Sequence, residues 1–340
     1  MEPALFYETQ ADKSVRCGLC RHYCSIAPGG RGICRVRENR DGTLVSLVGS
    51  QMVAQQIDPI EKKPLYHLLP GSLSFSVAGV GCNFSCRHCQ NVSIAKYDDQ
   101  GSGRMPGNTL IPQAAVTQAL RHGCSSIAYT YTEPTVWYEY ALQTARLADE
   151  AGLYNIFVTN GYIAPEPLRQ IAQYLHAANI DLKGFTEQFY WTICGARLDE
   201  TLNSIREYRR LGIWIELTTL IIPGHNDDRE QLDGIARFIA DELGPDTPWH
   251  ISRFFPHHRM TDLPPTPLES MQRAVEAGDR AGLRYIYEGN RTGGREATCC
   301  PHCRAVAVAR NGYRIERIAL QDGHCLTCGA SLAGIWRRRA

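Results

Sequence analysis

Helix-like and strand-like segments alternate through most of this sequence, and that alternation limits the possible folds more than any other feature. Helical stretches repeatedly end in glycine, which suits the left-handed position after a helix, and a β-branched or aromatic run follows at once. Two more strand-like runs cover residues 72–79 and 177–184. These units recur roughly every 30 residues and predict an α/β fold with a parallel sheet, as a partial or full (β/α) barrel. The glycines are Gly123, Gly152, Gly212 and Gly282.

The composition is that of a globular protein with a large core. The chain has 340 residues, 44% of them hydrophobic, and a formal net charge of +1, so neither nucleic acid nor a membrane is an expected partner. No signal-peptide pattern begins the sequence, and no run reaches the ~18–20 apolar residues of a membrane span. We therefore expect a cytoplasmic protein, in which the 14 cysteines bind metal or carry redox chemistry rather than form disulfides.

Three groups of clustered cysteines divide the chain. An N-terminal cysteine-rich segment is expected over residues 1–70, the barrel over residues 71–290, and a zinc-ribbon-like segment over residues 291–340. The middle group is the C-x3-C-x2-C pattern of GVGCNFSCRHCQN, which begins directly after the strand-like run 72–79. In a parallel barrel that point is the carboxyl edge, where active sites form. Its cysteines are Cys82, Cys86 and Cys89.

Three thiolates within eight residues can hold three corners of a [4Fe–4S] cluster and leave one iron without a protein ligand. An open coordination position can bind a substrate directly, as it does at catalytic zinc. The alternative is a zinc site that His88 or a distant cysteine completes.

C-x3-C-x2-C after the first strand of a βα repeat resembles the signature of radical S-adenosylmethionine (SAM) enzymes, over residues 73–287. The resemblance implies that the open iron chelates SAM. It further implies that reductive cleavage of SAM yields a 5′-deoxyadenosyl radical, which abstracts hydrogen from a substrate. Ferredoxin or flavodoxin would donate the electron. Residues that resemble SAM contacts are His88, Thr132, Glu133, Asn160, Asp181 and Lys183.

Each of these motifs also has a purely structural interpretation. Glu133 precedes a proline and could be a helix-start carboxylate, stabilised by the helix dipole. The TNG that contains Asn160 could be a simple turn, and Asp181 with Lys183 could be an ion pair. Their shared position at strand ends favours the functional interpretation.

The motifs CGLCRHYCSIAPGGRGICRVREN, IAYTYTEPTVWYEY and WHISRFFPHHRMTDLPPTP together resemble the radical SAM proteins of the AmmeMemoRadiSam system, over nearly the whole chain. That resemblance implies AMMECR-type and Memo-type protein partners. The family is related to the pyruvate formate-lyase activating enzymes, so glycyl-radical formation on a protein is one implied activity. A small metabolite inside the barrel is the competing substrate.

The two flanking cysteine groups each hold four thiols, which matches a closed metal site. The C-terminal group has two C-x2-C knuckles around a β-rich segment and predicts structural zinc. For the N-terminal group, zinc and an auxiliary iron–sulfur cluster both stay open, with zinc favoured; His22 could replace one thiolate. The groups are Cys300, Cys303, Cys325 and Cys328, and Cys17, Cys20, Cys24 and Cys34.

Two further residues are predicted to contact substrate. His250 and Arg253 lie in a strand-like run, and we expect them to face the reaction chamber. A different class of protein also fits the cysteines: a zinc-rich scaffold without catalysis. Iron in anaerobically purified protein would favour the enzyme, and zinc alone would favour the scaffold.

Overall fold

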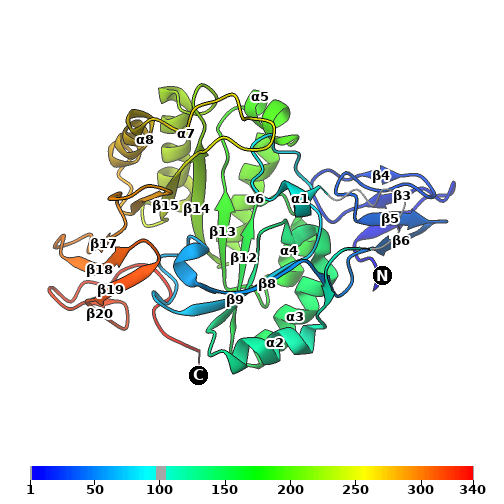
Figure 1. The fold of residues 1–340 in the computed structure, drawn as a ribbon, viewed down its shortest axis with the longest axis horizontal. Helices are drawn as coiled ribbons and strands as arrows, with labels where there is room; N and C mark the ends of the chain where they lie inside the picture. Colours follow the sequence, from blue (N-terminus) through cyan, green and yellow to red (C-terminus); the bar gives the residue numbers. More distant parts are fainter. Residues whose placement is uncertain (1, 97–104, 340) are drawn as a thin grey trace.

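The computed structural model describes residues 2–96 and 105–339, and an eight-stranded sheet forms its centre (Figure 1). The sheet order is β16-β15-β14-β13-β12-β11-β9-β8, so the edge strands β16 and β8 do not pair and the barrel stays open. Neighbouring strands are parallel, except that β8 runs antiparallel to β9. The predicted α/β fold is confirmed as a partial barrel. The strands are β8 (Ala54–Pro59), β9 (Leu73–Ala78), β11 (Ser126–Tyr129), β12 (Tyr154–Thr159), β13 (Ala177–Asp181), β14 (Trp214–Ile221), β15 (Trp249–Arg253) and β16 (Ile286–Gly289).

Helices connect successive parallel strands and pack their apolar faces on the sheet. None of the helices described has the length and apolar content that crossing a membrane requires. The α-helices are α1 (Val92–Ala95), α2 (Pro112–Arg121), α3 (Tyr138–Glu150), α4 (Pro165–Ile171), α5 (Glu187–Phe189), α6 (Leu198–Arg210), α7 (Arg229–Arg237) and α8 (Leu268–Arg280). Short 3-10 and π segments are η1 (Ile60–Lys62), η2 (Pro134–Trp137), η3 (Tyr190–Cys194) and η4 (Phe238–Leu243).

The predicted helix-ending glycines follow the helices as expected. Gly123 after α2 has φ +65°, and Gly212 after α6 has φ +79°. A Cβ at either position would meet nothing within 4 Å. The left-handed backbone, rather than crowding, therefore favours glycine at these two helix ends.

Small β structures lie on opposite sides of the barrel in Figure 1. The N-terminal segment forms two three-stranded sheets, and its later strand β8 joins the central sheet. The C-terminal segment forms a three-stranded sheet and a hairpin. These strands are β1 (Glu2–Pro3), β2 (Tyr7–Thr9), β3 (Val15–Cys17), β4 (Ser25–Ile26), β5 (Arg37–Arg40), β6 (Thr43–Ser46), β7 (Gln51–Met52), β10 (Asn108–Thr109), β17 (Thr298–Cys299), β18 (Val306–Asn311), β19 (Arg314–Ile318), β20 (Leu320–Gln321) and β21 (His324–Cys325).

A buried arginine makes one of the contacts between the C-terminal segment and the rest of the chain. Arg310 of β18 donates to the Tyr66 carbonyl at 2.8 Å, and its guanidinium lies 4.2 Å from the Tyr66 ring centroid. Its Nε is 3.6 Å from a Glu61 carboxylate oxygen, and both side chains are fully buried. Since breaking a buried ion pair leaves an uncompensated charge, this contact fixes the segment to the barrel.

Candidate active site

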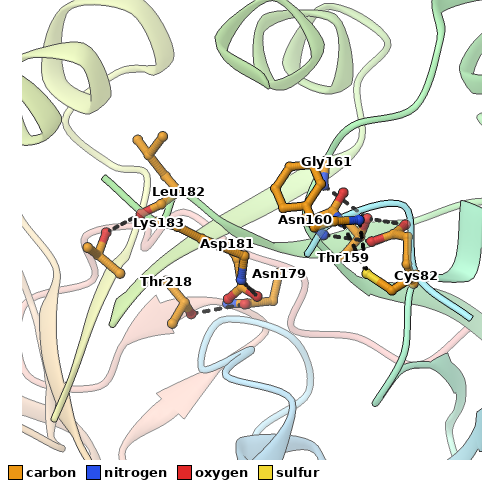
Figure 2. A network of polar contacts seen from close by, with 12 residues as sticks. Cys82, Thr159, Asn160, Gly161, Asn179, Asp181, Leu182, Lys183 and Thr218 are labelled. Atoms are coloured by element: carbon orange, nitrogen blue, oxygen red, sulfur yellow. Dashed lines mark hydrogen bonds and ion pairs between the residues drawn. The ribbon is translucent and has the colours of Figure 1, made fainter. Parts of the chain in front are cut away.

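The three-cysteine loop opens into a cavity of about 340 Å³ at the carboxyl edge of the sheet. Cys82, Cys86 and Cys89 all line it, together with every residue predicted to contact SAM. Those residues come from separate strand ends: Glu133 follows β11, Asn160 follows β12, and Asp181 ends β13. Figure 2 shows part of this arrangement, from Cys82 and Asn160 to Asp181 and Lys183.

Backbone hydrogen bonds hold the loop against the π segment η3. The amide of Ser85 donates to the Cys194 carbonyl at 2.7 Å, and the amide of Arg87 donates to the Ile193 carbonyl at 2.9 Å. Phe84 packs edge-on against Tyr162, with ring centroids 5.2 Å apart. These contacts position the loop against η3 and Tyr162.

The three sulfurs of the loop are not gathered as tightly as the four sulfurs of the C-terminal group. The described residues contain one group of three or more potential metal-ligand atoms that all lie within 4.8 Å of one another. That group is the four C-terminal cysteines. The sulfurs of Cys82, Cys86 and Cys89 are therefore more widely spaced, although they line one cavity. Ligands to a cubane bind different irons at its corners and so stand farther apart than ligands around one ion.

Cys86 is the thiol most readily ionised in the loop. Its pKa is lowered to about 7, first by a hydrogen bond with the Cys194 thiol and then by the charge of Lys183, against the opposing effect of burial. Burial raises the pKa of Cys82 and of Cys89. A thiolate is the form that binds iron, so the site favours the ligand form at Cys86.

Glu133 is a buried carboxylate at the N-cap of η2. One oxygen accepts hydrogen bonds from the Thr135 amide at 3.0 Å and from the Thr159 hydroxyl at 2.8 Å. The other accepts from the Asn160 amide at 2.9 Å. Burial raises its pKa, while these hydrogen bonds act in the opposite direction. Both interpretations of Glu133 are therefore compatible with the structure: it caps a helix and it lines the cavity.

Thr132 and Asn160 connect the cavity wall to the cysteine loop. The Thr132 hydroxyl donates to the Gly79 carbonyl at 2.6 Å, immediately before the loop. The Asn160 amide nitrogen donates to the Asn83 side chain at 2.8 Å and lies 3.8 Å from the Cys82 sulfur. These contacts orient the polar strand ends relative to the sulfurs.

Asp181 and Lys183 form an ion pair of 2.8 Å at the end of β13. Although burial opposes the charge, Asp181 and the nearby cysteines raise the pKa of Lys183 well above its ordinary value. The pKa of His88 is lowered to about 3, first by burial and then, in the same direction, by the charges of Lys183 and His225. The Nδ1 atom of His88 is buried and has no hydrogen-bond partner among the described residues. A neutral His88 and a charged Lys183 thus face the cavity together.

Sequence reasoning missed a group on the other side of the cavity. Lys62 and Lys63, just after β8, line it together with Tyr131. Asp58 accepts from Lys62 and from Lys63, each at 2.7 Å, and from the Tyr131 hydroxyl. Burial lowers the pKa of Lys63 to about 8, although Asp58 acts in the opposite direction. No local motif signals this group, because the antiparallel pairing of β8 with β9 creates it.

The structure does not bring His250 and Arg253 to the cavity. His250 lies near the start of β15, is buried, and bonds to a Glu216 carboxylate oxygen at 2.7 Å. Arg253 ends the strand, but its Nε donates to the Thr266 carbonyl at 2.8 Å. Neither side chain lines the cavity, whereas Ser252 between them does. Strand alternation places Arg253 on the face opposite Ser252, whereas His250 shares the face of Ser252 but lies nearer the start of the strand, away from the cavity.

The C-terminal cysteines form a compact four-sulfur group. Cys300 and Cys328 have sulfurs 3.6 Å apart, and Cys303 and Cys325 have sulfurs 3.7 Å apart. A metal–sulfur distance of about 2.3 Å places two thiolates of a tetrahedral site about 3.8 Å apart. The four residues therefore fit a single tetrahedral ion.

Comparison with known proteins shows the family of this chain. The family model of the radical SAM superfamily matches residues 76–239. An uncharacterised protein of Methanocaldococcus jannaschii is 41% identical over 335 residues, which cover 98% of this chain and 99% of that one. The crystal structure of Streptococcus suis SuiB bound to S-adenosylmethionine is similar with a TM-score of 0.50 and 14% identity; the match covers 67% of this chain and 52% of SuiB.

A domain of pyruvate-formate lyase-activating enzyme from Bacteroides vulgatus is also similar, with a TM-score of 0.43 and 19% identity over 49% of this chain and 99% of that domain. The chain belongs to the radical SAM superfamily. It is a radical SAM enzyme, and its three-cysteine loop lines the cavity at the carboxyl edge of the sheet.

Proposed function

We propose that this enzyme cleaves SAM reductively and uses the resulting radical to remove hydrogen from a protein segment that enters at the open edge of the barrel. The observation that carries the proposal is the single cavity that the three cysteines share with Glu133, Asn160 and Lys183. When bound, the [4Fe–4S] cluster supplies one electron to SAM, which yields methionine and a 5′-deoxyadenosyl radical.

The chain's own side chains suit the charged parts of SAM. Lys183 offers a permanent positive charge to the carboxylate, and Glu133 and Asn160 offer acceptors to the ammonium. His88, buried and neutral, offers a flat ring to the adenine. These contacts would hold the sulfonium next to the open iron, since all the groups line one cavity.

Two features favour a protein substrate over a metabolite. The cavity of about 340 Å³ is near the lower end of small-molecule sites, so one cofactor occupies most of it. The sheet is open between β8 and β16, and the lining includes Lys62 beside one edge and Asn290 beside the other. Glycyl-radical formation on a partner is the specific activity we propose, with AMMECR-type and Memo-type proteins as the first candidates.

A basic groove supports an acidic electron donor such as reduced ferredoxin or flavodoxin. The groove lies between Ile33 of the N-terminal segment and Cys86 of the cluster loop. Its described lining contains no carboxylate. Opposite charge on a partner would speed encounter and place its redox centre near Cys86. The cationic side chains are Arg31, which also pairs with Glu38 at 2.9 Å, Arg35, Lys96 and Arg259.

Zinc is the ion we propose for the C-terminal cysteines. Four soft thiolates at tetrahedral spacing select zinc or iron, and a small β segment gains folding energy from a closed zinc site. Metal analysis of protein without the other cysteine groups distinguishes the two ions.

The central test is anaerobic reconstitution followed by dithionite and SAM, with 5′-deoxyadenosine measured by chromatography. Wild-type protein should form it, and Cys86→Ala should not. Cys124→Ala is the matched control, because Cys124 is a buried cysteine in the core away from the cavity lining and should keep the activity. An intact cluster that forms no 5′-deoxyadenosine would refute the proposal.

The substrate is tested by deuterium transfer. Candidate partner proteins carrying deuterated glycine should place deuterium in 5′-deoxyadenosine. Transfer from a deuterated metabolite extract, with none from the partners, would contradict the protein substrate while leaving the SAM chemistry in place.

A further inference from the structure

The N-terminal cysteines surround one pocket next to the cluster loop. Cys17, Cys20, Cys24 and Cys34 line it, with Leu19, Ile26 and Val136 among the apolar side chains. Gly32 separates two of the sulfurs: a Cβ there would lie 3.8 Å from the sulfur of Cys24 and 3.8 Å from that of Cys34. Four thiols from one short stretch of the chain, residues 17–34, therefore converge on one pocket.

The spacing of these sulfurs differs from that at the C-terminal site. There, four sulfurs lie within 4.8 Å of one another, as one tetrahedral ion requires. Within residues 2–96 and 105–339, no three of the N-terminal sulfurs meet that limit, and the same is true of Cys82, Cys86 and Cys89. The N-terminal group thus shares its wider spacing with the loop that holds the cluster in this superfamily.

A wider set of four thiolates around an enclosed pocket suits a cluster with four irons. Each iron takes one thiolate, and the inorganic sulfides fill the space between them. A single zinc ion with bonds of about 2.3 Å would require the sulfurs to approach one another. The pocket sits in a well-anchored part of the chain: the buried ion pair of Arg37 with Glu139, at 2.9 Å, adjoins it.

The pocket of the N-terminal cysteines and the cavity of the cluster loop adjoin at Asn83. Asn83 lines the N-terminal pocket, while its neighbours Cys82 and Phe84 line the large cavity. The Asn83 carbonyl bonds to His22 Nε2 at 2.8 Å, so the N-terminal segment is hydrogen-bonded directly to the cluster loop.

We infer that Cys17, Cys20, Cys24 and Cys34 hold a second [4Fe–4S] cluster, in place of the zinc that their spacing in the sequence favours. Its location suits a one-electron relay. The second cluster accepts one electron from a low-potential one-electron carrier and passes that electron to the SAM cluster. By giving up the electron, the second cluster returns to its oxidised state. The relay rests on the proposed function, whereas the presence of the cluster does not.

The test is a variant that lacks the SAM cluster, with Cys82, Cys86 and Cys89 all replaced by alanine. After anaerobic reconstitution it should keep about four iron and four sulfide per chain, beside about one zinc. Dithionite should produce a paramagnetic signal that SAM does not change. Two zinc ions and no iron in this variant would overturn the inference.

Wild-type protein gives a second measurement if the variant does not fold. It should contain about eight iron per chain, and Cys20→Ala with Cys34→Ala should lower this to about four. About four iron in wild type, unchanged by those two substitutions, would also overturn the inference. Eight iron without 5′-deoxyadenosine formation would refute the proposed function and still support the second cluster.

Discussion

Replacing Lys183 by methionine should weaken SAM binding strongly and leave the fold intact. Methionine has a similar length but no charge. Its partner Asp181 has a side chain that is 35% exposed, so water can solvate the carboxylate once the lysine is gone. The change should therefore cost little stability, and its effect should fall on the ligand.

The magnitude follows from the charged hydrogen bond that the substitution removes. A hydrogen bond to a charged group contributes about 1.5–3 kcal/mol, and every 1.4 kcal/mol is about a tenfold change in affinity. We therefore expect the dissociation constant for SAM to rise roughly 10-fold to 100-fold. Anaerobic titration calorimetry on reconstituted protein measures it, with iron and sulfide content determined on the same samples.

The matched control is Lys62→Met. Lys62 also lines the cavity, but it pairs with Asp58 beside β8 rather than with the strand end at Lys183. If the lysines act only through the net charge of the cavity, both variants should weaken binding equally. Unchanged binding in Lys183→Met, or equal weakening in both variants, would refute the assigned contact.

Four further predictions address the rest of the chain. Arg310→Met should lower the free energy of unfolding in urea by about 3–5 kcal/mol, because it leaves a buried carboxylate unpaired. Cys303→Ala should release about one zinc and lower the Tm without loss of iron. Arg259→Glu should slow reduction by an acidic protein donor several-fold at low salt, and added salt should shrink the difference. Burial lowers the pKa of His67 to about 4, so between that value and the ordinary 6.5 the unfolded chain binds a proton that the folded chain lacks. The free energy of unfolding should therefore fall as the pH falls through this window. The fall should be smaller in His67→Gln.

The sequence is sufficient to predict the sheet and the residues at its carboxyl edge. Glycine after each helix and a β-branched run after each glycine are local signals, and parallel strands place their ends together. Glu133, Asn160 and Asp181, which are far apart in the sequence, accordingly line one cavity. Their roles toward SAM stay predictions, since the contacts described are those within the chain.

Other parts of the site depend on distant pairing and could not be predicted locally. Lys63 reaches the cavity because β8 pairs antiparallel with β9, and no spacing in the sequence marks that pairing. The prediction that His250 faces the chamber takes no account of depth along the strand: His250 shares a face of β15 with Ser252, which lines the cavity, but lies nearer the start of the strand. Its neighbour on β14, Glu216, holds it instead, and no sequence separation signals that contact.

The three cysteine groups lie in different parts of the molecule. The C-terminal segment packs at the end of the barrel where strands begin, since the Tyr154 hydroxyl at the start of β12 donates to the Arg337 carbonyl at 2.8 Å and His67 bonds to the Ala333 carbonyl at 2.7 Å. The N-terminal segment lies at the other end, bonded to the cluster loop through Asn83. If the electron donor and the protein substrate are those proposed above, electrons arrive on the N-terminal side and substrate at the open sheet edge, without sharing one entrance. An enzyme that generates a reactive radical gains from that separation, because the electron donor can dock while the substrate stays in place.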